Sequence, residues 1–321
     1  MFMMKKTIFP MMVGFVLTIL SCLPQPAMAQ QVVAAIIVAD LPRYSQAYDA
    51  MVEVLRAGGF DETKLKIFTQ KPNADKMSLI NSLRRCQSAN VNLVVTFGSR
   101  ATAAAMSELK DIPLLFADVY DPVALGVVKN LAAPGADATG ATSKTDLTEL
   151  VATVQKIRPL QQVGVIFTEG EAGAEQQLEE LRELAAKAGF KVEAENARNP
   201  KEALDKAVKL ASSSDALYLT ESIAVGQQGP EIVKKLASST LIFSQIPGLA
   251  AQGALAGLEA DPDEQGKLVA VQVLQILQGQ KALLLPVRSA KKVGLFINQD
   301  TATALGVTVP AEVASQATLV N

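Results

Sequence analysis

Polar residues able to bind a charged small molecule follow several short apolar segments of the sequence. Gly98-Ser99-Arg100 follows the apolar run 93–97, and Glu221-Ser222 follows the run 216–219. A hydroxyl and free N–H groups at a helix start suit a carboxylate or phosphate, whereas a carboxylate such as Glu221 suits an ammonium group. Together they predict a site for an amino acid zwitterion. The other candidates of this kind are Asp40, Asp118, Thr168, Glu169, Ser244 and Gln245.

Each candidate also has a simpler structural interpretation. Ser99 could act only as a helix cap, and Arg100 could either bind a carboxylate or extend into solvent. Asp40 and Asp118 compete with Glu221 for the ammonium group, and either could instead stabilise a turn. Two aromatic residues, Tyr44 and Tyr120, could cover an apolar part of the ligand, although Tyr44 could belong to the core.

The sequence contains no histidine. This excludes a Ser-His-Asp triad, a Cys-His pair and a histidine-based metal site. The sequence also lacks a phosphate-binding Gly-rich loop and a C-x-x-C motif, and the acidic stretch 261–264 lacks the spacing of a calcium loop. We therefore expect no catalytic residues, metal or cofactor. An enzyme that uses the carboxylates of Asp118 and Glu221 remains the alternative.

Apolar runs and amphipathic stretches alternate along the first half of the chain. We expect strands near residues 32–38, 65–68, 93–97 and 114–116, with helices near 44–57, 74–89 and 99–109 between them. Strands that are apolar on both faces and joined by helices predict a parallel sheet covered on both sides. The polar residues after such strands gather at one edge of the sheet, where ligands bind.

The same alternation restarts after about residue 140. Strands are expected near 163–167, 192–194, 216–219 and 241–243, with helices at 172–188, 200–212 and 225–237. Residues 121–140 are expected to form a helix and a loop before a crossover strand. The sequence thus predicts an α/β fold of two Rossmann-like lobes joined by several crossings. Lobe 1 would comprise 30–140 and about 259–285, and lobe 2 would comprise 141–258 and about 286–321.

The first 29 residues have the pattern of an export signal. Lys5 and Lys6 precede an apolar run over residues 7–20, and residues 27–29 (AMA) form an A-x-A cleavage site. The run is shorter than the roughly 20 residues of a spanning helix. We expect cleavage after Ala29 and a periplasmic location. The alternative is a lipoprotein acylated at Cys22, for which the preceding residues are a poorer match.

The expected mature chain has few features that suggest a macromolecular partner. Removing residues 1–29 leaves a mild acidic excess and no basic cluster, so we expect no nucleic-acid partner. Cys86 would be the one remaining cysteine, which excludes an internal disulfide. We expect a monomer.

Several motifs occur in an order that resembles a known family. They are residues 98–101 (GSRA), 112–116 (IPLLF), 121–128 (DPVALGVV), 133–140 (APGADATG), 285–287 (LPV) and 296–298 (FIN). This order is similar to the ABC transporter substrate-binding family that includes TrpX-type proteins. The chain departs from the family pattern at Ser99-Arg100, at Ala136-Asp137, around Glu221, and in the segment 41–44 (LPRY), which lacks a histidine often found there.

The resemblance implies a type I periplasmic binding protein-like fold and a role in uptake. It implies the solute-binding component of an ABC-type importer, which works with a permease in the inner membrane and binds a small polar solute such as an amino acid. A sensor subunit for a kinase or chemoreceptor remains an alternative that the sequence does not separate from it.

Overall fold

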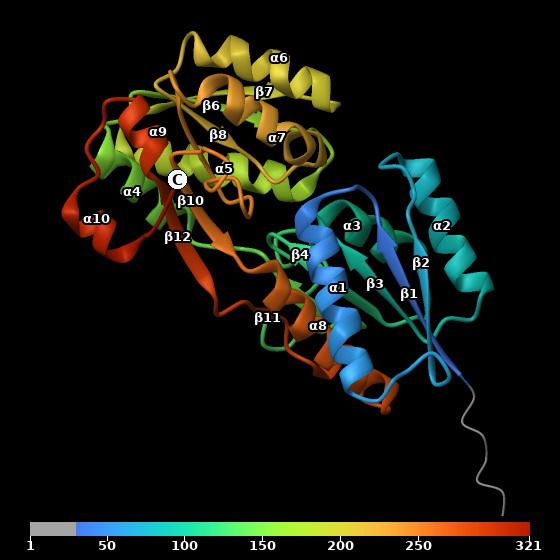
Figure 1. The fold of residues 1–321 in the computed structure, drawn as a ribbon. Helices are drawn as coiled ribbons and strands as arrows, with labels where there is room; N and C mark the ends of the chain where they lie inside the picture. Colours follow the sequence, from blue (N-terminus) through green and yellow to red (C-terminus); the bar gives the residue numbers. More distant parts are fainter. Residues whose placement is uncertain (1–29) are drawn as a thin grey trace, which may run out of the picture.

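The computed structural model describes residues 30–321, which form two α/β lobes (Figure 1). Each lobe contains one β-sheet, and no strand is shared between the two sheets. The predicted fold class is therefore confirmed. The expected export signal and Cys22 lie outside the described residues. Within residues 30–321, no helix has both the length and the apolar character needed to cross a membrane.

The sheet of the first lobe is parallel throughout, in the order β11-β5-β4-β3-β1-β2. Its strands are β1 (Gln31–Ile37), β2 (Leu65–Gln70), β3 (Leu93–Phe97), β4 (Leu114–Val119), β5 (Ala138–Thr142) and β11 (Arg288–Ser289). The helices of this lobe are α1 (Pro42–Ala57), α2 (Lys76–Ser88), α3 (Ser99–Glu108) and α8 (Pro262–Leu277), with the short 3-10 helix η1 (Ala282–Leu284) after α8. Every residue of β3 and β4 is buried, as a strand covered on both faces requires.

The sheet of the second lobe has the order β13-β12-β10-β9-β8-β6-β7. Its strands are β6 (Gln162–Phe167), β7 (Lys191–Asn196), β8 (Ala216–Leu219), β9 (Leu241–Ser244), β10 (Ala256–Ala260), β12 (Val293–Asn298) and β13 (Thr318–Val320). The helices are α4 (Leu147–Ile157), α5 (Ala172–Ala188), α6 (Pro200–Ala211), α7 (Ile223–Leu236), α9 (Gln299–Ala304) and α10 (Ala311–Gln316). β12 runs antiparallel to β10, and the other pairings are parallel.

The chain passes between the two sheets after β5, after β10 and after β11. The second passage leads into α8, which packs against α1 of the first lobe. β11 pairs with β5, so residues 288–289 belong to the first sheet, slightly beyond the expected boundary near 286. Figure 1 shows β10 and β12 extending from the second lobe toward the first.

The prediction of a helix after Asp121 is wrong. Residues 122–126 form only a turn, in which the Leu125 N–H donates to the Asp121 carbonyl. Gly126 has a φ of 70°, which is outside the helical region and ends the turn. The turn leads by a loop to β5.

The crossing of α1 and α8 depends on Gly266. A Cβ at this position would lie 2.0 Å from the backbone oxygen of Ala47 on α1. The two helices can therefore approach this closely only where α8 has no side chain. A larger residue would force the backbones apart.

We predict that Gly266→Ala lowers the free energy of unfolding by about 1–3 kcal/mol, because the steric conflict outweighs the helix propensity gained. Urea unfolding followed by circular dichroism would measure the change. Val271→Ala on the exposed side of α8 is the matched control and should change stability by no more than about 0.5 kcal/mol. Equal effects of the two substitutions would contradict the close helix crossing.

Candidate functional site

The two lobes contact each other through Ser99 and Glu221. The Ser99 hydroxyl, at the start of α3, donates to Glu221 Oε1 at 3.1 Å, and the Ser143 hydroxyl lies 3.4 Å from Glu221 Oε2. Gly173 of α5 makes room for this contact, because a Cβ there would lie 2.2 Å from Glu221 Oε1 and 2.6 Å from Ser99 Oγ. The strand ends of the two sheets thus meet at Glu221.

Arg43 brings a second carboxylate, that of Asp118, close to Glu221. Its Nε contacts Asp118 Oδ2 at 2.6 Å, and both side chains are buried. Its NH2 group donates to the backbone oxygen of Glu221 at 2.7 Å, so Arg43 of the first lobe also binds the second. Asp118 has a φ of 56° and its N–H donates to Gln265, which fixes the carboxylate beneath Arg43.

Burial and nearby charge disfavour ionisation of Glu221. They raise its pKa to about 8, with burial as the main cause and the Asp118 carboxylate as the second, while Arg43 and the Ser99 hydrogen bond act in the opposite direction. When Glu221 is ionised, Asp118 and Glu221 together carry two negative charges against the one positive charge of Arg43. In that state the three side chains are short of one positive charge, which a proton on Glu221 or a bound cation supplies.

Arg100 and Glu171 form a further ion pair between the lobes. Arg100 Nη1 lies 3.4 Å from Glu171 Oε1, and Glu171 Oε2 accepts from the Ile223 N–H at 2.9 Å. Burial raises the pKa of Glu171, although Arg100 and Ile223 oppose the shift. Because Glu171 compensates Arg100, a ligand carboxylate would have to compete with Glu171 for this guanidinium.

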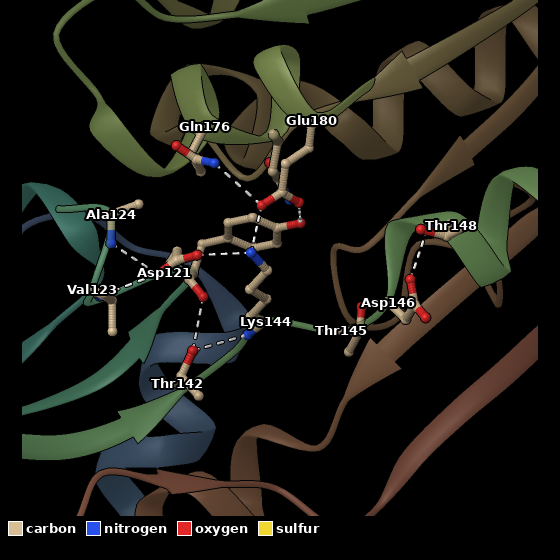
Figure 2. Close-up of polar contacts among 12 residues, drawn as sticks. Asp121, Val123, Ala124, Thr142, Lys144, Thr145, Asp146, Thr148, Gln176 and Glu180 are labelled. Carbon is tan, nitrogen blue, oxygen red and sulfur yellow. Dashed lines mark hydrogen bonds and ion pairs between the residues drawn. The ribbon is translucent and has the colours of Figure 1, made fainter. Parts of the chain in front are cut away.

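Lys144 connects the lobes at the first crossing of the chain, just after β5 (Figure 2). Its Nζ donates to Asp121 Oδ2 at 2.7 Å and to Glu180 Oε1 on α5. The Tyr120 hydroxyl donates to Glu180 Oε2 at 2.7 Å, and the ammonium group of Lys144 lies 5.5 Å from the centre of the Tyr120 ring. Tyr120 and Asp121 follow β4 of the first lobe, so these contacts also hold the lobes together.

Gln245 lies in a buried hydrogen-bond network below Glu221. Its Oε1 accepts from the Tyr218 hydroxyl at 2.6 Å and from Gln177 at 3.2 Å, and its Nε2 donates to Thr145. Gln177 Oε1 in turn accepts from the Glu221 N–H at 2.8 Å. This network fixes the backbone position of Glu221.

The start of α3 presents backbone donors beside Glu221. No side chain caps this helix, and its N-cap residue is Gly98 with a φ of 87°. A Cβ on Gly98 would lie 2.1 Å from the Tyr44 hydroxyl oxygen, so a side chain is excluded on steric as well as conformational grounds. An uncapped helix start suits an anionic group such as a carboxylate.

The structure places the candidate residues in two groups. Ser99, Asp118 and Glu221 lie together, with Gly98, Arg100 and Gln245 connected to them as described. Tyr44 is buried in the first core but borders this group, because its ring lies 4.8 Å from the Arg43 guanidinium. The side chains of the others are engaged elsewhere: Asp40 is exposed beside α1, Thr168 and Glu169 bond to Ala197 and Asn196, Ser222 caps α7, and Ser244 bonds to Leu219.

The sequence did not identify three residues of the site, which are Arg43, Ser143 and Glu171. Arg43 follows β1 in the segment LPRY, one residue before Tyr44, so its position after a strand was the available signal. Ser143 follows β5 in the same way. Glu171 follows β6 in the same way, but its contact with Arg100 joins distant segments and could not be predicted from the sequence. Among residues 30–321, no cluster of three or more His, Cys, Asp or Glu side chains could hold a metal ion.

We predict that Arg43→Met destabilises the protein by about 3–5 kcal/mol, because it leaves the buried Asp118 carboxylate without its cation. Chemical unfolding would measure the loss. Arg84→Met is the matched control, since Arg84 is exposed and its ion pair with Glu108 should contribute at most about 1 kcal/mol. A loss below about 1 kcal/mol for Arg43→Met would contradict the buried ion pair.

We predict that the ligand-free lobes separate more often at pH 9 than at pH 6. The contact between the lobes raises the pKa of Glu221 from its ordinary value of 4.5 to about 8. Protonation of Glu221 therefore stabilises the contact fully below about pH 4.5, and this stabilisation is lost as the pH rises through about 8. Small-angle scattering should show a larger radius of gyration at pH 9. Glu221→Gln should remove most of this dependence, and an unchanged dependence in that variant would assign it to other groups.

The comparisons with known proteins agree with this architecture. The family model described as ABC transporter substrate binding protein matches residues 32–321. A tyrosine-binding protein of Clostridioides difficile (strain R20291) is 25% identical over 269 residues, which cover 82% of this chain and 77% of the relative.

Two solved structures have similar shapes. One is an ABC domain from Streptococcus pneumonia in complex with L-Trp, with a TM-score of 0.85 and 23% identity over 91% of this chain and 100% of the other. The other is a conserved domain protein from Vibrio cholerae, with a TM-score of 0.85 and 26% identity over the same shares. The family match spans nearly all described residues, and the chain belongs to the ABC transporter substrate-binding protein family.

Proposed function

We propose that this chain is the solute-binding component of an ABC-type importer and that it binds an amino acid zwitterion between its lobes. The observation that carries the proposal is the shortage of one positive charge when Glu221 is ionised beside Asp118 and Arg43. The ammonium group of an amino acid supplies that charge. It would take the place of the proton that the raised pKa of Glu221 favours.

The carboxylate of the ligand would bind at the start of α3. The uncapped N–H groups there lie next to the Ser99 hydroxyl, which already contacts Glu221 at 3.1 Å. Donors for a carboxylate and an acceptor for an ammonium group are thus adjacent, as the two ends of one α-amino acid require. A relative is named for tyrosine and a similar structure contains L-Trp, which supports aromatic amino acids as the first ligands to test.

Transport would use the contacts between the lobes as a switch. A ligand that binds both Ser99 and Glu221 stabilises the arrangement in which the lobes touch, and that arrangement would be the form that a permease in the inner membrane recognises. The contacts of Lys144 with Asp121 and Glu180 at the crossing after β5 would support the same arrangement. Export to the periplasm through the segment 1–29 belongs to this proposal.

We predict that Glu221→Gln weakens amino acid binding about ten- to a hundredfold, because a charge-assisted hydrogen bond in a site shielded from water contributes roughly 1.5–3 kcal/mol. Ser99→Ala should weaken it less, since the backbone N–H groups of α3 remain. Calorimetry against a panel of amino acids, L-tyrosine and L-tryptophan included, would measure both effects.

Glu169→Gln is the matched control, because Glu169 also follows a strand of the second lobe but is exposed and bonds to Asn196. It should bind as tightly as the unmodified chain. If Glu221→Gln also binds as tightly, the ammonium site assigned here is wrong. If the unmodified chain binds no amino acid, the solute belongs to another chemical class.

A further inference from the structure

A pocket lies where the chain crosses between the lobes after β10 and before β12, apart from the Ser99 and Glu221 contact. We call it the hinge pocket. Its volume is about 420 Å³. The first lobe contributes Pro42 and Gln46 of α1, together with Pro262 of α8. The second lobe contributes Gly248, Gln252 and Glu259, and the returning chain contributes Lys292, Val293, Gly294 and Phe296. A pocket of this size accommodates a small organic molecule.

Glu259 of β10 gives the pocket a specific polar group. The residue is only 8% exposed. Its Oε2 accepts from the Gly248 N–H at 2.7 Å, but its Oε1 is buried without a hydrogen-bond partner. A buried carboxylate oxygen of this kind is costly, and a cation or a strong donor would compensate it.

The other charges at the pocket leave Glu259 without a cation. Lys292 lies at the rim with a largely exposed side chain, and its Nζ is 3.8 Å from Asp261 Oδ2. Asp261 itself caps α8 through the N–H groups of Asp263 and Glu264. The one lysine that lines the pocket therefore compensates Asp261, and no cation among the lining residues compensates Glu259. Burial raises the pKa of Glu259, as expected for a carboxyl group without a cation.

The rest of the wall is mainly apolar. Pro42, Pro247, Pro262, Val293 and Phe296 line it. A ligand that fits would combine one positive charge with an apolar body. A highly hydrated metal ion or a sugar would leave these five side chains without a partner of matching polarity.

We propose that this hinge pocket is a second binding site, for a small organic ammonium ion with an apolar body. Its walls come from both lobes, so a bound molecule would depend on how the lobes are arranged. Binding there would therefore be coupled to ligand binding at the Ser99 and Glu221 contact, and each ligand would change the affinity of the other by the same factor.

Titration with benzylammonium chloride, followed by protein NMR or calorimetry, tests the site. Benzyl alcohol is the neutral probe of similar shape. We expect benzylammonium to bind at least tenfold more tightly than benzyl alcohol, and Glu259→Gln to remove most of that difference.

Two surface variants guard against a folding defect in Glu259→Gln. Gln46 is an exposed residue of α1 at the pocket, so Gln46→Lys and Gln46→Glu change only the charge at its edge. Gln46→Lys should weaken benzylammonium binding about threefold and Gln46→Glu should strengthen it by a similar factor. Equal binding of the two probes, or binding unaffected by all three variants, would overturn the proposal.

The Glu221→Gln variant separates this proposal from the proposed function. The Glu221→Gln variant should bind benzylammonium at the hinge pocket as the unmodified chain does. Its affinity for amino acids should be weakened. If Glu221→Gln instead abolishes benzylammonium binding and the Gln46 variants do not alter it, the probe occupies the contact between the lobes and the hinge site is wrong. Failure of the hinge site would leave amino acid binding unaffected.

Discussion

At the contact between the lobes, the Arg43 guanidinium binds the Asp118 carboxylate and the backbone oxygen of Glu221. The Glu221 carboxylate lies in the same buried region, and much of the structure positions these three groups. Asp118 is the last but one residue of β4 in the first sheet, Glu221 follows β8 of the second, and Arg43 lies in the first turn of α1. Burying two negative charges with one positive charge is unfavourable unless another cation or a proton joins them. The raised pKa of Glu221 expresses this imbalance. A solute with an ammonium group would correct it.

Small residues and backbone bonds make this arrangement possible. Gly98 lets the start of α3 lie against the Tyr44 hydroxyl, and Gly173 lets α5 approach Glu221. Gln265 and Gln177 bind the N–H groups of Asp118 and Glu221, so each carboxylate is fixed from its own lobe. Each half of the site is thus held by a hydrogen bond within its own lobe.

The sequence was sufficient to predict the two sheets but not the side-chain contacts between the two lobes. Fully apolar runs such as 93–97 identified buried parallel strands, and the polar residues after them identified Ser99, Asp118 and Glu221. The position of Thr168 and Glu169 after β6 gave the same signal, yet their side chains bond to Ala197 and Asn196 at the end of β7. Strand-end position alone does not determine the direction of a side chain.

Contacts between distant segments were the main feature that the sequence did not reveal. Arg43 reaches Asp118 and Glu221 only because α1 turns back over the sheet, and Glu171 reaches Arg100 only when the lobes touch. The helix expected after Asp121 failed for a local reason, since Gly126 ends it after one turn.

The most direct test of the missing positive charge compares one ligand with and without its amino group. Calorimetry would measure the binding of L-tyrosine and of 3-(4-hydroxyphenyl)propionate, which keeps the ring and the carboxylate but has no ammonium group. The account predicts that L-tyrosine binds at least about tenfold more tightly, because only L-tyrosine compensates Asp118 and Glu221. Equal affinities, or tighter binding of the propionate, would contradict it.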